Sequence, residues 1–338
     1  MIRAAIAKVV GGADLTDDEA TCVMQEILSE GATPAQIASF LTAMRMKGET
    51  SSEIAAFARM MRTHAVRITP KVDGTLVDTC GTGGDLSHSF NISTGAAFVA
   101  AGAGVSIVKH GNRSVSSRCG SADLLEELGL NLNITPDSAS RIMEQIQITF
   151  LFAPNHHPAM RNVAGPRREI GIRTVFNLLG PLTNPAGAKA QLLGVYAPEL
   201  TDRVAEVLRL LGTEHAMVVH GAGMDEITTT GDTLVSELKD GEINNYLIRC
   251  EAFGLKRAHP DDLKGGDAKE NARMLLEVLE GEKGAVRDVM VMNAAAAIYL
   301  GKKGRTLREG LRRAETSIDT GQALDKLNRL IDETRGAT

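Results

Sequence analysis

The sequence predicts an α/β protein with a small all-helical N-terminal domain and a larger α/β domain that has a mainly parallel central sheet. Two observations lead to this prediction. Residues 1–67 carry helix start signals and no strand pattern, whereas short apolar runs alternate with helical stretches from about residue 74. Such alternation is typical of a parallel sheet covered by helices on both faces. At 338 residues, the chain is long enough for two domains.

The N-terminal helices are predicted by three capping boxes, in which a threonine precedes Glu or Gln by three residues: Thr16 and Glu19, Thr33 and Gln36, Thr50 and Glu53. Apolar residues from Ile37 to Met44 recur at helical spacing.

The alternating pattern then predicts buried strands at Leu76-Val77, Val105 to Val108, Ile148 to Phe152, Gln191 to Tyr196 and Ala216 to Val219. Helices are expected at 93–102, 121–128, 136–146, 200–211 and, after a later strand region, 267–334. Ligands of such sheets bind beyond the carboxyl ends of the strands, where Gly81, His110 and Gly221 fall.

The segment from Ala164 to Pro185 interrupts this alternation, because it is helical in pattern and rich in Gly, Pro and Arg near its ends. We expect it to cross back to the helical domain as part of a hinge. The predicted domains are therefore 1–70, with a returning segment near 165–185, and 71–164 together with 186–338.

Composition narrows the possible functions. The chain has no Trp and 3% aromatic residues, so it lacks the stacking platforms of a single-strand nucleic-acid binder. Its net charge of −5 requires any anion site to be a local feature. Cys22, Cys80, Cys119 and Cys250 form no CxxC pair, which is typical of reduced thiols in a cytosolic protein. We expect no signal peptide and no membrane span.

The stretch GTGGD follows the first predicted strand. Gly81, Gly83 and Gly84 allow positive φ and close approach of a ligand to the backbone. Consecutive N–H groups, with a helix predicted to begin near Ser93-Thr94, suit a phosphate or pyrophosphate. The stretch matches neither the dinucleotide-binding pattern GxGxxG nor the P-loop pattern GxxxxGK[ST]. On these residues alone, a phosphate-binding loop and a purely structural strand-to-helix turn, with Ser93 or Thr94 as the N-cap, are equally favoured.

The stretch from Lys109 to Asp123 gathers cations and hydroxyls after the second strand: Lys109, His110, Arg113, Arg118, Ser114, Ser116, Ser117 and Ser121. This density fits several phosphate oxygens. A solvated basic turn is the alternative, which the neighbouring GTGGD makes less favoured. We expect Ser121 to cap the next helix.

Asp225 and Glu226 lie side by side after a later strand, and adjacent carboxylates suit Mg²⁺. These two acids could instead be ordinary surface residues, but the two phosphate-like loops favour a metal site.

His156 and His157 have no third ligand at metal spacing, which favours structural or substrate-pocket histidines over a zinc site. Arg167 and Arg168 could either bind an acidic ligand or simply lie on the surface, and the sequence favours neither role over the other. No serine triad or cysteine nucleophile assembles.

These residues together resemble the anthranilate phosphoribosyltransferase family over nearly the whole chain. The motifs that carry the resemblance occur in family order: GTGGD at 81–85, FNIST at 90–94, KHGNR at 109–113, HHPAM at 156–160, GIRTVFNLLGPLTNP at 171–185 and DE at 225–226. Departures are small, such as Ser89 where the family often has Thr and the variable positions 114, 118 and 119.

The resemblance implies transfer of a phosphoribosyl group from phosphoribosyl pyrophosphate to the amine of anthranilate, in a homodimer that packs through its helical domains. From the composition, we expect a cytoplasmic protein that binds neither nucleic acid nor membrane. The implied phosphoribosyl pyrophosphate site comprises Gly81, Gly84, Asp85, Ser89, Asn91, Ile92, Ser93, Thr94, Lys109, His110, Gly111, Asn112, Arg113, Ser114, Val115, Ser116, Ser117 and Ser121. Anthranilate would contact Gly81, Asn112 and Arg167, with His110 and the His156-His157 region nearby. Mg²⁺ would be held by Ser93, Asp225 and Glu226. No residue is assigned as general acid or base.

Two alternative functions remain to be considered. A pyrimidine-nucleoside phosphorylase has the same general architecture and binds phosphate beside a ribose, but it has no need of the Asp225-Glu226 pair. A non-catalytic nucleic-acid-binding relative predicts loss of GTGGD or of that pair and a broad basic face. The chain keeps both motifs and is acidic overall, and fold alone does not decide between these functions.

Overall fold

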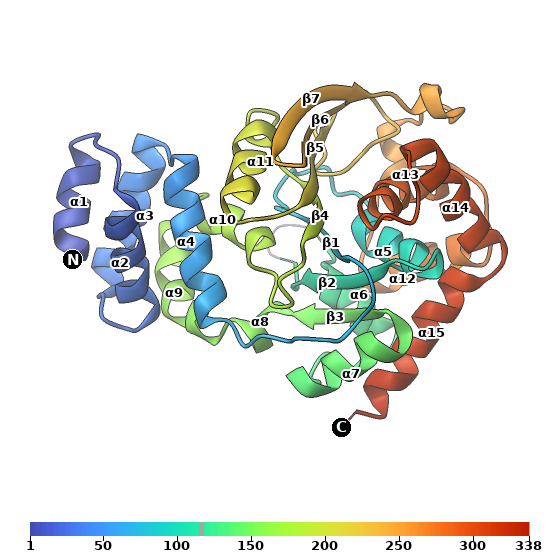
Figure 1. The fold of residues 1–338 in the computed structure, drawn as a ribbon, viewed down its shortest axis with the longest axis horizontal. Helices are drawn as coiled ribbons and strands as arrows, with labels where there is room; N and C mark the ends of the chain where they lie inside the picture. Colours follow the sequence, from blue (N-terminus) through green and yellow to red (C-terminus); the bar gives the residue numbers. More distant parts are fainter. Residues whose placement is uncertain (115–117, 338) are drawn as a thin grey trace.

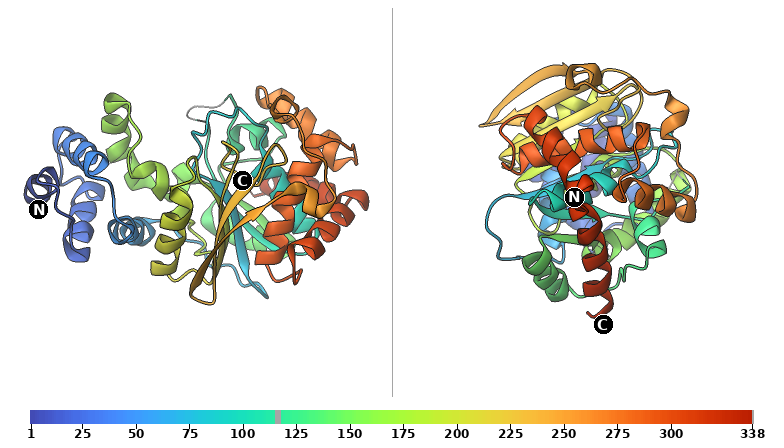
Figure 2. Two further views of the ribbon diagram at one scale, coloured as in Figure 1. Left: turned by 90° about the horizontal axis from the view of Figure 1, so that it is seen from above. Right: turned by 90° about the vertical axis from the view of Figure 1, so that its right-hand side faces the viewer.

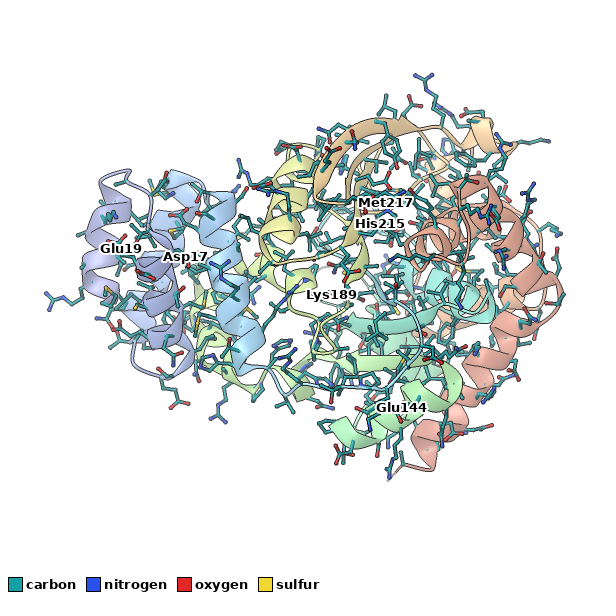
Figure 3. All side chains as sticks on the ribbon, viewed as in Figure 1. Asp17, Glu19, Glu144, Lys189, His215 and Met217 are labelled. Atoms are coloured by element: carbon teal, nitrogen blue, oxygen red, sulfur yellow. The ribbon has the colours of Figure 1, made fainter. Side chains whose placement is uncertain are left out.

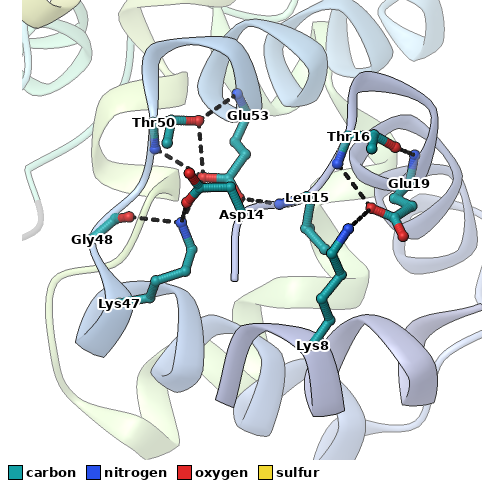
Figure 4. Close-up of polar contacts among 9 residues, drawn as sticks. All are labelled: Lys8, Asp14, Leu15, Thr16, Glu19, Lys47, Gly48, Thr50 and Glu53. Atoms are coloured by element: carbon teal, nitrogen blue, oxygen red, sulfur yellow. Dashed lines mark hydrogen bonds and ion pairs between the residues drawn. The ribbon is translucent and has the colours of Figure 1, made fainter. Parts of the chain in front are cut away.

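The computed structural model describes residues 1–114 and 118–337 (Figure 1). The predicted ligand contacts Val115, Ser116 and Ser117 lie outside the described residues. The N-terminal part consists of four helices: α1 (Ile2–Val10), α2 (Asp17–Leu28), α3 (Pro34–Lys47) and α4 (Ser51–His64). All three predicted capping boxes are formed at the starts of α2, α3 and α4, and Figure 4 shows those of Thr16 and Thr50.

The larger part is built on a seven-stranded sheet of order β3-β2-β1-β4-β5-β6-β7. Five strands are parallel: β1 (Leu76–Gly81), β2 (Ser106–Gly111), β3 (Ile148–Phe152), β4 (Ala190–Gly194) and β5 (His215–Gly221). The last two, β6 (Thr233–Lys239) and β7 (Glu242–Ile248), are antiparallel. The prediction of a mainly parallel sheet is therefore confirmed, and its five strands lie where the apolar runs placed them.

Helices cover both faces of the sheet, as Figure 2 (left) shows. One face packs on α5 (Ile92–Gly102) and on the C-terminal helices, with α6 (Ser121–Glu127) and α7 (Pro136–Ile146) nearby. The other face packs on α11 (Leu200–Leu210), which also contacts α4. The stretch expected as helix over 267–334 is four helices: α12 (Ala268–Leu279), α13 (Ala285–Leu300), α14 (Leu307–Asp319) and α15 (Gln322–Arg335).

The chain leaves the sheet after β3 and returns to the N-terminal helices. It forms α8 (Ala153–His156), α9 (Arg161–Ile170) and α10 (Phe176–Leu179), and α9 packs against α2 and α3 (Figure 1). Short 3₁₀ turns lie at Pro158–Met160, Pro181–Thr183, Cys250–Phe253 and Pro260–Leu263. Two connections, 65–75 and 180–189, thus lead from helices into β1 and β4.

Two expected N-caps were wrong, although the predicted start of the helix at residue 121 agrees with the structure. The residue that precedes α5 is Asn91, so neither Ser93 nor Thr94 is the N-cap. Gly120 precedes α6, and its N–H donates to the Asp123 carboxylate, which leaves Ser121 as the first helical residue rather than the cap. The Ser121 hydroxyl instead accepts a 3.1 Å hydrogen bond from Thr94. Within the described ranges, no helix is long and apolar enough to cross a membrane.

Candidate active site

Strands β1 and β4 end in glycines that make room for Asp225. A Cβ on Gly81 would lie 2.3 Å from Oδ2 of Asp225, and one on Gly194 would lie 1.5 Å from its carbonyl oxygen. Neither distance is possible for a real side chain, so both positions require glycine for steric reasons. Gly83 and Gly84 have φ of 64° and 74°, which only glycine adopts without strain.

Asp225 is tied to the glycine loop by hydrogen bonds. The Gly83 N–H donates to Oδ2 of Asp225 at 2.7 Å, and the Asp225 N–H donates to Oδ2 of Asp85 at 3.2 Å. The sequence prediction placed both motifs beyond the carboxyl ends of strands, and the structure brings them into direct contact. One N–H of the predicted phosphate loop therefore already has a carboxylate partner.

Glu226, which follows β5, lies beside the start of α5. There the backbone N–H of Ser93 donates to Oε1 of Glu226 at 3.1 Å. Burial, followed by repulsion from Asp225, raises the pKa of Glu226, and burial followed by repulsion from Asp85 raises the pKa of Asp225 to about 7. The ion pairs of the described residues include neither acid. A hard divalent cation would remove the repulsion between these carboxylates.

The donor set fits Mg²⁺, because two carboxylates and the Ser93 hydroxyl offer the oxygen ligands that this ion prefers. The described residues contain no group of three His, Cys, Asp or Glu side chains that could hold a metal by themselves. Mg²⁺ is commonly held by one or two protein carboxylates together with water and substrate phosphates. Asp225 and Glu226 match that pattern.

Lys109 and His110 were predicted as cations of a loop, and this was wrong. Both belong to β2, where alternation sends their side chains to opposite faces. Lys109 is 4% exposed and donates to the Ser93 hydroxyl at 3.2 Å and to the Thr79 carbonyl at 2.5 Å. His110 is buried with its ring 5.1 Å from that of His157, and burial holds its pKa well below the usual value.

Arg113 follows β2 in the loop, but its charge already has protein partners. Its guanidinium pairs with Glu126 at 2.7 Å and with Asp123 at 3.0 Å, both on α6. The side-chain oxygen of Asn112 accepts the N–H of Arg113 at 2.8 Å. A phosphate that binds Arg113 would compete with two carboxylates.

The residues that flank the start of α5 form a scaffold around Ser93. Asn91 donates to the Cys119 carbonyl at 3.2 Å and accepts from Asn271 at 2.8 Å, so both ends of its amide are used. Ile92 and Thr94 are buried. Ser89 pairs with Lys264 in an isolated β-bridge. These contacts fix the position of the helix start.

Arg167 lies on α9, with its guanidinium 5.4 Å from the ring centre of Phe176. Burial lowers its pKa, and it forms no ion pair within the described residues. His156, also on the returning segment, has Nδ1 2.7 Å from the Val66 carbonyl oxygen, and burial lowers the pKa of His157 to about 4. These contacts give His156 a structural place beside the 65–75 connection.

Sequence reasoning missed Arg173, which joins the returning segment to the glycine loop. Its guanidinium donates to the Gly84 carbonyl and lies 4.4 Å from the ring centre of Tyr196. The motif GIRTVFNLLGPLTNP contains this arginine, but a motif by itself does not say which side chain reaches another loop.

Two family models match the chain: a glycosyl transferase family helical bundle domain over residues 3–65 and a glycosyl transferase family a/b domain over residues 73–324. The anthranilate phosphoribosyltransferase of Methanocorpusculum labreanum is 56% identical over 98% of this chain and 97% of its own length. That of Methanosphaerula palustris is 56% identical over the full length of both chains.

Solved structures agree with these matches. The crystal structure of anthranilate phosphoribosyltransferase from Thermus thermophilus has a TM-score of 0.93 and 43% identity, covering 98% of this chain and 99% of that one. The Saccharomyces cerevisiae enzyme in complex with PRPP and Mg has a TM-score of 0.89 and 29% identity, covering 99% and 98%. The same yeast enzyme has been solved in complex with 4-fluoroanthranilate.

Proposed function

The chain belongs to the anthranilate phosphoribosyltransferases of the glycosyl transferase family, and we propose that its reaction takes place at the carboxyl edge of the sheet. It transfers the phosphoribosyl group of phosphoribosyl pyrophosphate to the amine of anthranilate, giving N-(5-phosphoribosyl)anthranilate and pyrophosphate in tryptophan biosynthesis, with Mg²⁺ as cofactor. The observation that supports this location most strongly is the direct contact between the glycine loop and Asp225.

The phosphoribosyl pyrophosphate site is proposed to comprise the residues that the sequence motifs assigned to it. Within the described residues these are Gly81, Gly84, Asp85, Ser89, Asn91, Ile92, Ser93, Thr94, Lys109, His110, Gly111, Asn112, Arg113, Ser114 and Ser121. Several are joined to one another through Ser93, Asp225 and Glu226. Lys109 contributes a buried positive charge beneath the site, where low dielectric strengthens its attraction for an anion.

Ser93, Asp225 and Glu226 are proposed to hold Mg²⁺. When bound, the ion supplies positive charge to the pyrophosphate group that leaves. The chain's own part is to hold two carboxylates close together in a buried position, which the hydrogen bonds from Gly83 and Ser93 accomplish.

Gly81, Asn112 and Arg167 are proposed to bind anthranilate. Arg167 would orient the carboxylate so that the amine faces C1 of the ribose, a positioning role. Its half-buried guanidinium without an acidic partner among the described residues supports this assignment. An aromatic amine needs little activation before it attacks a carbon with oxocarbenium character, so we assign no general base.

The domains are proposed as 1–70, with a returning segment near 165–185, and 71–164 together with 186–338. The family matches over 3–65 and 73–324 support this division. We further propose a cytoplasmic homodimer that packs through the helical domains. The dimer is supported by exposed apolar residues on or beside α1 and α3, namely Met1, Val10 and Met46. The cytoplasmic location is supported by the free cysteines.

The test of the function is the loss of anthranilate fluorescence when phosphoribosyl pyrophosphate is added, with Mg²⁺ and then with EDTA. We expect a loss that EDTA abolishes. Well-folded protein that leaves the fluorescence unchanged would exclude anthranilate as the acceptor, and activity on thymidine plus phosphate would then be measured.

A further inference from the structure

A basic cavity lies away from the loops described above. It has a volume of about 120 Å³ and is lined by Arg62, Arg67, Lys189, Asn184, Gly187 and Gly212, among others. None of its lining residues belongs to the proposed substrate or metal sites. Lys189 and Thr213 precede β4 and β5, so the cavity opens toward the amino edge of the sheet, opposite the carboxyl edge where Asp225 lies.

The three cations of this cavity have no acidic partner among the described residues. Within residues 1–114 and 118–337, no Asp or Glu lines the cavity, and no ion pair includes any of the three cations. Arg62 uses Nε to donate to the Leu182 carbonyl at 2.8 Å, and Lys189 donates to the Gly212 carbonyl at 3.1 Å. The terminal nitrogens of Arg62 and the guanidinium of Arg67 remain available as donors.

Placing like charges together is unfavourable unless an anion offsets them. Burial, followed by repulsion from Arg67, lowers the pKa of Arg62 to about 10. A cavity of 120 Å³ has room for more than one water, whose share of liquid volume is about 30 Å³. Guanidinium groups present pairs of donors that match the oxygens of phosphate.

The cavity is built from both connections between the helices and the sheet. Arg62 lies in the last turn of α4, and Arg67 lies in the 65–75 connection. The 180–189 connection contributes Asn184, Gly187 and Lys189. The Ile68 N–H donates to the Pro185 carbonyl at 3.3 Å, so the two connections run side by side. Lys189 is labelled near the middle of the molecule in Figure 3.

We propose that this cavity binds a small oxyanion of the phosphate class through Arg62, Arg67 and Lys189, and that the bound anion ties the 65–75 connection to the 180–189 connection. The anion is free inorganic phosphate or the phosphate group of a small metabolite. This site is distinct from the proposed active site, and its existence does not depend on the reaction catalysed there.

The first test is a calorimetric titration of inorganic phosphate into protein saturated with phosphoribosyl pyrophosphate and Mg²⁺, without anthranilate. Binding of phosphoribosyl pyrophosphate is measured beforehand in the same cell, so a failure of the proposed active site would be seen separately. We expect one phosphate per chain to bind. Heat that disappears once phosphoribosyl pyrophosphate is present would place phosphate in the active site only and overturn the proposal.

Variants locate the site. Arg67→Gln and Lys189→Gln, both at exposed positions, are each expected to weaken phosphate binding at least tenfold. The matched control Arg312→Gln, an exposed arginine on α14, is expected to leave the Kd within twofold. Unchanged affinity in both cavity variants would overturn the site. A titration with ribose 5-phosphate distinguishes the sources, because tighter binding than that of phosphate favours a phosphorylated metabolite.

The second test follows hydrogen exchange at Ile68, whose N–H crosses between the two connections. Phosphate is expected to slow exchange of this amide at least twofold in the wild-type protein and not in Arg67→Gln. Binding without any slowing would overturn the claim that the anion ties the connections together.

Discussion

The backbone N–H of Gly83 donates a 2.7 Å hydrogen bond to the carboxylate of Asp225, although 142 positions separate the two residues in the sequence. The bond joins the loop that follows β1 to the loop that follows β5. The position of the proposed metal ligand therefore depends on the same glycine loop that is proposed to bind phosphate. A change in either loop is expected to disturb both functions.

Gly81→Ala tests this dependence. The new Cβ would lie 2.3 Å from Oδ2 of Asp225, so the carboxylate has to move. Because misplacement by about 1 Å can cost about 10²-fold in rate, we expect kcat/KM for phosphoribosyl pyrophosphate to fall by about that factor. The control is Gly336→Ala, whose nearest neighbour would be an ordinary 3.6 Å away. Equal kcat/KM values in the two variants would contradict the steric argument.

Asp225→Asn keeps the shape of the side chain and removes its charge. We expect the Mg²⁺ concentration at half-maximal rate to rise at least tenfold and kcat to fall by about 10²–10³, comparable to losing a group that stabilises charge in a transition state. The measurement is a Mg²⁺ titration of the rate, with EDTA as the zero point. Asp18→Asn, at an exposed position on α2, serves as the control. A Mg²⁺ dependence identical to wild type would remove Asp225 from the metal site.

Arg167→Ala tests the binding of anthranilate. A hydrogen bond to a charged group contributes about 1.5–3 kcal/mol, so we expect the KM for anthranilate to rise about 10- to 150-fold. The KM for phosphoribosyl pyrophosphate should stay within about threefold. The adjacent Arg168, which is exposed, provides the matched control Arg168→Ala. A rise of similar size in the control would indicate a general effect of charge on this helix.

The pH dependence of stability is expected to reflect Asp78. Burial raises the pKa of this carboxyl from its usual 3.8 to about 6. The folded protein therefore holds the proton more tightly than the unfolded chain, which stabilises it below about pH 4, and this contribution is lost as the pH rises through about 6. A shift of about two units corresponds to at most ~3 kcal/mol.

The measurement compares the free energy of unfolding of wild type and Asp78→Asn by chemical denaturation at pH 4 and pH 7. We expect the wild type to lose up to ~3 kcal/mol relative to the variant between these pH values. The buried histidines make stability rise with pH, because burial lowers their pKa. This contribution is present in both proteins, so it cancels when the variant is subtracted from the wild type. Parallel pH profiles would show that Asp78 titrates normally.

Glu53 and Glu19 occupy equivalent places in two capping boxes (Figure 4), but only Glu53 is buried. Glu53 is buried and also accepts from the Leu15 N–H at 2.8 Å and from Lys47 at 3.0 Å. We expect Glu53→Ala to lower the free energy of unfolding by about 3–5 kcal/mol, because Lys47 and buried donors lose their partner. Glu19→Ala should lower the free energy of unfolding much less, because the Glu19 carboxylate pairs with Lys8 and caps α2 at a solvent-accessible position. Equal losses in urea denaturation would contradict the role of burial.

The predictions from the sequence succeeded where the relevant contacts are local. A capping box joins residues three apart, and a strand is recognised from a short apolar run, so the N-terminal helices and the five parallel strands followed from sequence alone. They failed at the N-caps of α5 and α6, where Asn91 and Gly120 rather than a serine or threonine precede the helix. There the competing partners, Asn271 and Asp123, decided the geometry.

By itself, the sequence determined the fold class, the N-terminal helices that begin with capping boxes, the five parallel strands and the motifs, because these depend on periodicity, capping and short spacings. Only the tertiary structure decided that Asp225 lies against Gly81 and Gly194, that Lys109 is buried beside Ser93, and that Arg173 reaches Gly84. Each of these contacts joins segments brought together by strand register and helix packing. Such long-range neighbours are set by the sheet as a whole and cannot be read from either segment alone.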